Sequence, residues 1–144
     1  MNVETVPYIA IIERCKVDAM EYLPDLPKEN TVEAWESFLD ELETIRDDSY
    51  YHAGECVQQW DWAIYTHYGW KILFALPSDI ERQAESEFFD VWGQVTIYSL
   101  NGWWEMASMI ACFALEIIFR ETLEEMAQEL IELAESQLEN MESV

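Results

Sequence analysis

Carboxylate side chains are the groups in this sequence whose number and spacing can do chemistry. The 144 residues include 30 Asp and Glu but only 7 Lys and Arg, so the formal net charge is −23. One series of acids advances by four, three, four, three and four residues, which places it on a single helix face. It contains no base, since Arg46 is expected to point elsewhere. Its members are Glu29, Glu33, Glu36, Asp40, Glu43 and Asp47.

A second series lies in residues 121–142, a stretch with no Lys or Arg. On a helix its glutamates fall within roughly 140° of arc, and apolar residues take the opposite side. We therefore expect this stretch to dock along the domain with its acids held outward. The glutamates are Glu121, Glu124, Glu125, Glu129, Glu132, Glu135, Glu139 and Glu142.

Acids with this spacing can imitate the phosphates of DNA. Those that alternate at three and four residues lie about 4.5–6 Å apart along a helix axis, and duplex DNA has one phosphate per ~3.4 Å on each strand. Carboxylates pair with Lys and Arg as phosphate oxygens do. Two such faces side by side would present a phosphate-like array to a basic groove. The alternative is two solvated helix faces, although ordinary surfaces intersperse both signs.

Patterns for catalysis or metal binding are scarce by comparison. His52 and His67 have no nucleophile at a recognised spacing, and the sequence lacks the G-x-S-x-G, P-loop, dinucleotide-binding and Glu-x-x-His patterns. The nearest metal-like group joins Asp48 and His52 with Glu55 and Cys56, and we interpret it as ordinary polar residues at a helix start. The sequence therefore predicts no enzymatic activity, no cofactor and no metal.

The elements that must position these acids are predicted to be helices. Pro7 to Leu23 forms the first, which the prolines of Pro24-Asp25-Leu26-Pro27 end. Asn30 to Asp48 is the clearest, with Asn30 as its cap and Glu33 completing a capping box. Its buried stripe is Val32, Trp35, Phe38, Leu39, Leu42 and Ile45.

Residues 50–76 predict a third, aromatic helix, in which Gly54 and Gly69 are candidates for kinks or ends. We interpret its aromatic row as core packing, with a dimer surface as the main alternative. Seven Trp are many for one small bundle to bury, so we expect a homodimer, which the repulsion between two chains at −23 opposes. The row is Trp60, Trp62, Tyr65, Tyr68 and Trp70.

Two more helices are expected beyond residue 76. Pro77-Ser78 ends the aromatic helix, and Ser78 caps the fourth with Glu81. Residues 94–100 are helical or irregular, because a lone strand has nothing to pair with, and Asn101-Gly102 turns the chain. In the last tract, residues 103–142, a narrow line of polar residues runs along the apolar first half: Glu105, Ser108, Cys112 and Glu116. On one straight helix this line would emerge opposite the acidic face of the second half. Either the helix kinks near Arg120, or different neighbours cover its two halves.

The whole sequence indicates an all-α fold, an irregular bundle of about five helices in a single domain over residues 1–144. Its hydrophobic fraction of 51% and its many aromatic residues separate it from disordered acidic tails. Cys15, Cys56 and Cys112 are odd in number and lack a C-x-x-C pair, so we expect reduced core thiols. No signal peptide or membrane span is recognisable, which predicts a cytoplasmic protein.

The charge also predicts the partner, since it disfavours nucleic acid and anionic membranes and favours a basic protein. In size, helical content and acidic ridges the sequence resembles the phage DNA-mimic anti-restriction proteins of the overcome-classical-restriction (Ocr) type. Residues 57–68, VQQWDWAIYTHY, are similar to the centre of small acidic phage and bacterial proteins, and residues 111–116 fit their apolar helix. This resemblance brings no catalytic residues and implies a phage or mobile-element setting, hence the cytoplasm of a bacterial host.

We therefore expect a non-enzymatic inhibitor that mimics DNA and blocks a DNA-binding host defence protein, a restriction or CRISPR-type nuclease. An immunity- or antitoxin-like partner of one specific basic protein is the alternative, and a metal or small-molecule bundle enzyme is a third. The predicted partner-binding residues are Glu29, Glu33, Glu36, Asp40, Glu43, Asp47, Glu121, Glu125, Glu129, Glu132, Glu135 and Glu139.

Overall fold

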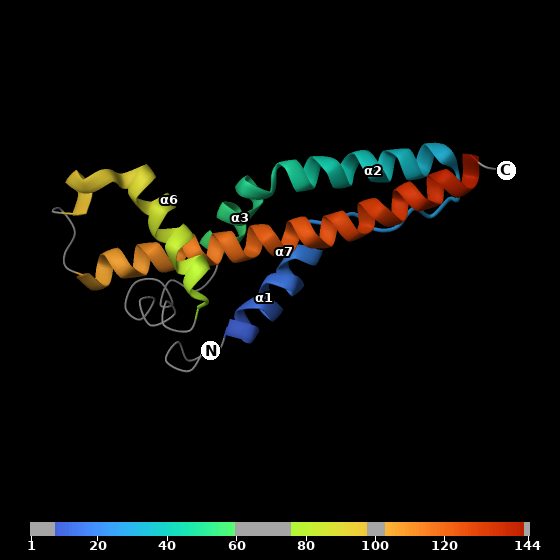
Figure 1. Ribbon diagram of the computed structural model, residues 1–144. Coiled ribbons are helices and arrows are strands. Elements are labelled where there is room, and N and C mark those ends of the chain that lie inside the picture. Colours follow the sequence, from blue (N-terminus) through green and yellow to red (C-terminus); the bar gives the residue numbers. More distant parts are fainter. Residues whose placement is uncertain (1–7, 60–75, 98–102, 143–144) are drawn as a thin grey trace.

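The computed structural model describes residues 8–59, 76–97 and 103–142, which form five helices and no strand. This confirms the all-α, bundle-like fold predicted from the sequence. The last helix contacts each of the other four and passes through the whole molecule (Figure 1). The helices are α1 (Tyr8–Met20), α2 (Val32–Asp47), α3 (Ser49–Gln58), α6 (Ser78–Ile97) and α7 (Trp103–Glu142).

α7 is one helix of 40 residues, about 60 Å long. Its polar line changes sides because its neighbours change, which is the second of the two alternatives expected from the sequence. Side chains of α1, α3 and α6 join residues 107–123 of α7 in the main core, in which Phe88 and Phe119 are fully buried. Beyond that core α7 pairs with α2, and a second cluster forms from Phe38, Leu42, Ile131 and Ala134. The α2–α7 pair thus extends from the core as an arm (Figure 1).

The connector of residues 21–31 runs beside the second half of α7 from the end of α1 to the start of α2 (Figure 1). α1 ends at Met20, three residues before the predicted Leu23. The N–H groups of residues 21–23 bond to the carbonyls of residues 18–20 at 3.0–3.3 Å, so the chain tightens into turns there. Pro24 then cannot continue a helix.

The predicted cap of α2 is wrong by one residue. Thr31 is the cap, because its Oγ1 accepts a hydrogen bond from the N–H of Ala34 at 3.2 Å. The Oδ1 of Asn30 instead accepts from Trp35 Nε1 at 2.9 Å and from Gln137 Nε2 at 3.2 Å. Asn30 therefore ties the tip of the arm together rather than starting the helix.

The third and fourth helices also differ from the prediction at their ends. α3 begins at Ser49 and ends at Gln58, so the single helix predicted over residues 50–76 is wrong at its end. Gly54 marks neither end, because it lies inside α3, where a Cβ would stand 3.6 Å from Oε1 of Glu116. α6 starts with Ser78 as a helical residue, because the N–H of Glu81 bonds to the carbonyl of Pro77 at 3.2 Å. Residues 94–97 are helical, as expected.

Some predictions fall on residues outside the described ranges. These are the aromatic row from Trp60 to Trp70, the homodimer inferred from it, Gly69 and the Asn101-Gly102 turn. Within residues 8–59, 76–97 and 103–142, no helix is both long and apolar enough to cross a bilayer.

Candidate partner-binding surface

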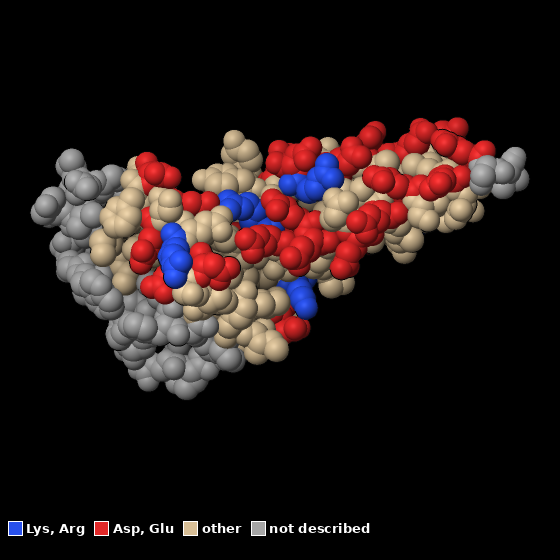
Figure 2. Space-filling view, in the orientation of Figure 1, with Lys and Arg blue, Asp and Glu red and all other residues tan. Residues whose placement is uncertain are grey.

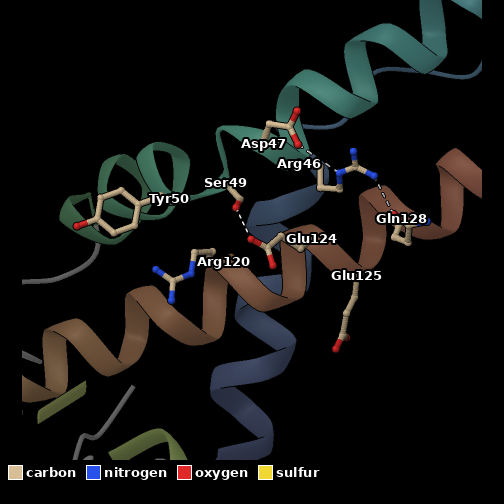
Figure 3. Close-up of a pocket in the computed structure, with 8 residues that line it drawn as sticks. All are labelled: Arg46, Asp47, Ser49, Tyr50, Arg120, Glu124, Glu125 and Gln128. Carbon is tan, nitrogen blue, oxygen red and sulfur yellow. Dashed lines mark hydrogen bonds and ion pairs between the residues drawn. The ribbon is translucent and has the colours of Figure 1, made fainter. Parts of the chain in front are cut away.

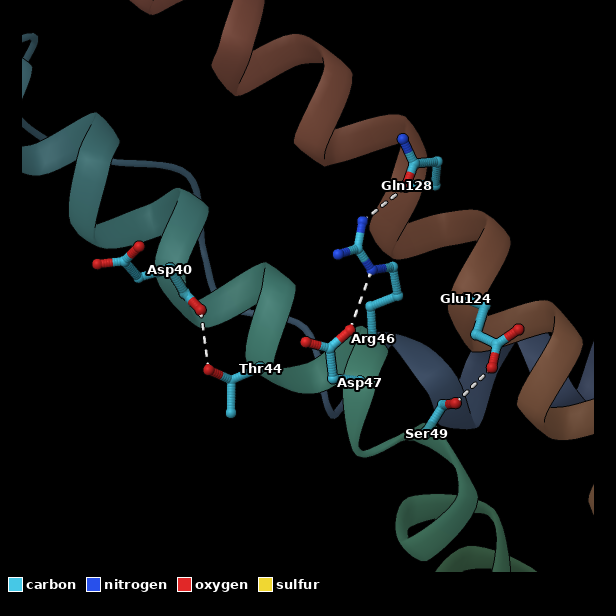
Figure 4. Close-up of polar contacts among 7 residues, drawn as sticks. All are labelled: Asp40, Thr44, Arg46, Asp47, Ser49, Glu124 and Gln128. Carbon is cyan, nitrogen blue, oxygen red and sulfur yellow. Dashed lines mark hydrogen bonds and ion pairs between the residues drawn. The ribbon is translucent and has the colours of Figure 1, made fainter.

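The two helices that carry the acidic series lie side by side and run in opposite directions. Three hydrogen bonds join α7 to α2 and to the residues that flank α2. The residue numbers rise along α7 as they fall along α2, an order that only an antiparallel arrangement allows (Figure 4). The α2–α7 pair therefore brings together two rows of acids that are far apart in the sequence. The joining hydrogen bonds are Gln137 to Asn30 at 3.2 Å, Arg46 to Gln128 at 3.1 Å and Ser49 to Glu124 at 2.5 Å.

An apolar seam between the helices fixes which sides face outward. Phe38 and Leu42 of α2 pack with Ile131 and Ala134 of α7, and all four are buried. The ring of Trp35 meets that of Phe38 edge-on, with centroids 5.7 Å apart. Burying a side chain as large as Phe38, Leu42 or Ile131 stabilises a protein by about 1.5–3 kcal/mol. The seam thus holds both rows in register, and their carboxylates remain in water.

The predicted partner-binding acids are surface residues. Every one is exposed except Glu43, which is half-buried. Glu29 lies in the connector before α2, so the α2 row proper begins at Glu33. Figure 2 shows Asp and Glu over most of the arm on the face in view. We call this the acidic surface: the exposed acids of α2 together with those of α7 beyond residue 120.

Two arginines lie at the base of the acidic surface, around an open depression of about 630 Å³ (Figure 3). Arg46 bonds to Asp47 at 3.4 Å, so it contacts an acid of the series from which it was expected to point away. It also reaches across to Gln128 of α7 at 3.1 Å. Arg120 pairs with Glu87 of α6 at 3.2 Å, and its guanidinium lies 5.6 Å from the centre of the Tyr50 ring. Both cations are thus held by neighbouring elements, and periodicity alone gave no sign of it.

The pKa of Glu121, at the end of the α7 row nearest the core, is shifted from its ordinary value. Partial burial raises the pKa of Glu121, and the nearby charges of Glu125, Glu124 and Asp79 raise it further, while Arg120 lowers it. The acidic surface is therefore expected to lose charge early at this end on acidification.

The metal-like group read from the sequence makes other contacts. The ring of His52 packs against Tyr22, with centroids 4.9 Å apart, and Cys56 Sγ lies 3.7 Å from Asp18 Oδ2. Among the residues the structure describes, no group of three or more His, Cys, Asp or Glu side chains is placed to hold a metal ion. Asp48, His52, Glu55 and Cys56 thus form no such site.

No disulfide joins the three cysteines, all of which lie within the described ranges. Cys15 and Cys56 are buried, and Cys112 is half-buried. Burial is the main cause that raises the pKa of Cys15 and of Cys112 to about 12, so both thiols are neutral at physiological pH. The core positions expected from the sequence are confirmed for Cys15 and Cys56, and their reduced state stays a prediction.

Comparison with protein-family models, with curated proteins and with solved structures finds no match to this chain. The function must therefore be argued from the surface itself.

Proposed function

We propose that this protein is a non-enzymatic inhibitor that imitates duplex DNA and blocks a DNA-binding host defence protein, a restriction or CRISPR-type nuclease. One observation carries the proposal. The antiparallel α2–α7 pair carries two rows of acids side by side over a buried apolar seam. A tail that served only solubility would need neither the seam nor the register.

The dimensions of the acidic surface suit a short duplex. The α2 row from Glu33 to Asp47 covers about 21 Å of helix axis, and the α7 row from Glu121 to Glu139 about 27 Å. The longer row corresponds to roughly eight base pairs at ~3.4 Å each. Packed helices lie about 8–10 Å apart, so the carboxylates form two separate lines, as the phosphates of two strands do.

The binding step would follow the physics of DNA binding. Lys and Arg of the target groove would pair with exposed carboxylates such as Glu36, Asp40 and Glu132, and the counterions of both surfaces would be released. Affinity should therefore fall steeply as salt rises. Because the acidic surface and DNA would occupy the same groove, each should exclude the other.

A pull-down from a bacterial lysate tests the proposal. Immobilised protein is incubated at about 50 and about 200 mM salt, and bound proteins are eluted with a duplex of about a dozen base pairs. We expect the duplex to release DNA-binding proteins, with much less captured at the higher salt. Captured proteins that no excess of duplex releases would contradict DNA mimicry.

The second candidate is an immunity- or antitoxin-like partner of one basic protein. The depression around Arg46 and Arg120 favours it, because two arginines and the ring of Tyr50 stand there among the carboxylates and interrupt the uniformly negative surface (Figure 3). A surface with such a local change in shape and charge can match one partner and exclude others. Tight capture of a single protein that persists at high salt and resists duplex DNA would support this candidate instead.

A further inference from the structure

An apolar groove lies beside the acidic surface, between the end of α1, the connector and the second half of α7. Its volume is about 480 Å³, and its lining is apolar except for Asp25 and Glu129. Met20 is 65% exposed and Leu26 is 56% exposed, so both apolar side chains are open to a ligand. Its apolar lining is Met20, Leu23, Pro24, Leu26, Met126 and Leu130.

The groove is continuous with the acidic surface around the α7 helix. Measured from Glu121, Glu129 lies about 80° around the axis and Leu133 about 120°. Met126 and Leu130, which line the groove, lie at about 140° and 180°. Leu133 is 44% exposed and so extends the apolar strip toward the acids. A ligand that contacts the acidic row can therefore reach the groove past Glu129.

We propose that the groove binds a basic amphipathic segment of the partner. Its apolar side chains would enter the groove while its Lys or Arg side chains pair with Asp25 and Glu129. The proposal rests on the proposed function, because the partner is the same basic protein. Exposed apolar surface rimmed by polar groups marks a recognition site, and amphipathic helices dock into such grooves through one apolar face.

Charge decides which occupant fits the groove. A second copy of this chain would bring another −23 to a site that already holds two acids, so like charges would face each other. A neutral apolar segment would gain nothing from Asp25 and Glu129. A segment with one apolar and one basic side satisfies both kinds of lining at once.

The groove would give the inhibitor selectivity that carboxylates alone lack. Exposed ion pairs weaken as salt screens them, whereas apolar contacts do not. The affinity for a target with the basic amphipathic segment would still fall as salt rises, but less steeply than the affinity for other DNA-binding proteins. The acidic surface would then attract DNA-binding proteins in general through their basic grooves. The apolar groove of this protein would determine which of those proteins it binds most tightly.

A labelled synthetic helix of about four turns, with Leu on one face and Lys on the other, is the probe. The test variant is Met20→Gln with Leu26→Gln. The matched control is Ile9→Gln with Val17→Gln, which removes two α1 side chains of similar exposure, 67% and 63%, that do not line the groove. Circular dichroism confirms that both variants are folded.

We expect the test variant to bind the probe at least about tenfold more weakly than wild type, and the control variant to bind it within about twofold. A second probe with Gln in place of Leu keeps the charge and should bind weakly to all three proteins. Equal binding of the Leu–Lys probe by test variant and wild type overturns the proposal. So does equal binding of both probes, and so does a wild-type dimer in sedimentation that the test variant fails to form.

The groove and the proposed function can fail separately. Loss of the groove effect, with lysate partners still released by duplex DNA, removes the groove proposal and leaves DNA mimicry in place. The opposite result is also possible: no duplex releases the captured partners, but Met20→Gln with Leu26→Gln still weakens binding of the probe. That result would remove DNA mimicry and leave a groove for basic amphipathic segments.

Discussion

The two halves of α7 are one continuous helix with opposite surroundings. Up to Phe119 the helix is enclosed by α1, α3 and α6, and most of its side chains are buried. Beyond Arg120, α2 and the connector cover only part of its circumference, and acids make up most of the exposed positions. The same backbone thus serves as core at one end and as a charged surface at the other.

The boundary between the two halves of α7 shows where a row of charged carboxylates can begin. Glu116 lies on the core side, where burial and the charge of Glu87 raise its pKa. Arg120 bridges to Glu87 at that level. Beyond Arg120, most of the glutamates of α7 are exposed to water, and they form a row that contains no Lys or Arg. Coverage by neighbours, rather than helix geometry, therefore decides where an array of carboxylates can exist in this chain.

The core half should respond most to loss of volume. Phe119→Ala removes a fully buried ring at the centre of the main core, and we expect the free energy of unfolding to fall by about 3–5 kcal/mol. Leu133→Ala on the arm, where the side chain is 44% exposed, should change it by less than about 1 kcal/mol. Urea denaturation measures both. Similar losses for the two variants would erase the contrast between core and arm.

The arm half should respond most to reversal of charge. Replacing Glu33, Glu36 and Asp40 with Lys leaves the seam untouched, so stability should stay equal or rise as repulsion is relieved. We expect binding to the partner recovered by pull-down to weaken by at least about a hundredfold, roughly 2.7 kcal/mol. Titration calorimetry at moderate salt measures this affinity.

A matched control for that reversal uses acids on the other helices. Glu13, Glu85 and Asp90 are exposed on α1 and α6, and changing them to Lys alters the net charge equally. If this control weakens binding as much as the α2 reversal, overall charge and not the acidic surface attracts the partner.

Neutralising the α7 row should have a smaller effect. Gln has a helix propensity similar to that of Glu, so a variant with Gln at 125, 129, 132 and 135 should stay helical by circular dichroism. We expect affinity for the same partner to fall by at least about tenfold, roughly 1.4 kcal/mol. Unchanged affinity in the folded variant would confine binding to the α2 row.

The sequence predicted the helices and the outward acids because both follow from local periodicity. Phe38 and Leu42 face the seam while Glu36 and Asp40 face water, as the 3.6-residue repeat requires. It did not predict that α2 and α7 are antiparallel neighbours, because a helix face does not say which other face covers it. The groove was missed for a related reason: residues 21–26 have no repeat, and their path beside α7 is fixed only by tertiary contacts.

Asn30 shows the same limit at the level of one side chain. Its position before a helix suggested a cap, but its oxygen joins Trp35 to Gln137. We expect Asn30→Ala to leave α2 formed and to lower the free energy of unfolding by about 1 kcal/mol, since a hydrogen bond contributes about 0.5–1.5 kcal/mol net. Hydrogen exchange should accelerate at the arm tip and not in α6. Protection unchanged at the tip would show that the apolar seam alone fixes the register.

The smallest expected effect lies at the boundary between the halves, at Glu116. Burial and Glu87 raise its pKa above the ordinary value of 4.5, so the folded protein holds this proton more tightly than the unfolded chain does. Stability from this group is therefore lowest above the folded-state pKa and recovers as the pH falls through it toward 4.5. Glu116→Gln removes the buried charge and leaves the Arg120–Glu87 pair in place.

We expect Glu116→Gln to raise Tm by a few degrees at neutral pH, with the difference from wild type shrinking as the pH is lowered toward 4.5. Glu85→Gln, at an exposed position of α6, removes the same formal charge and should raise Tm less. Thermal melts at three pH values measure the differences. If Glu116→Gln and Glu85→Gln behave alike at every pH, the boundary between the halves is not set by the burial of charge. Relief of overall repulsion would then account for both, and Glu116 would belong with the acids of the arm.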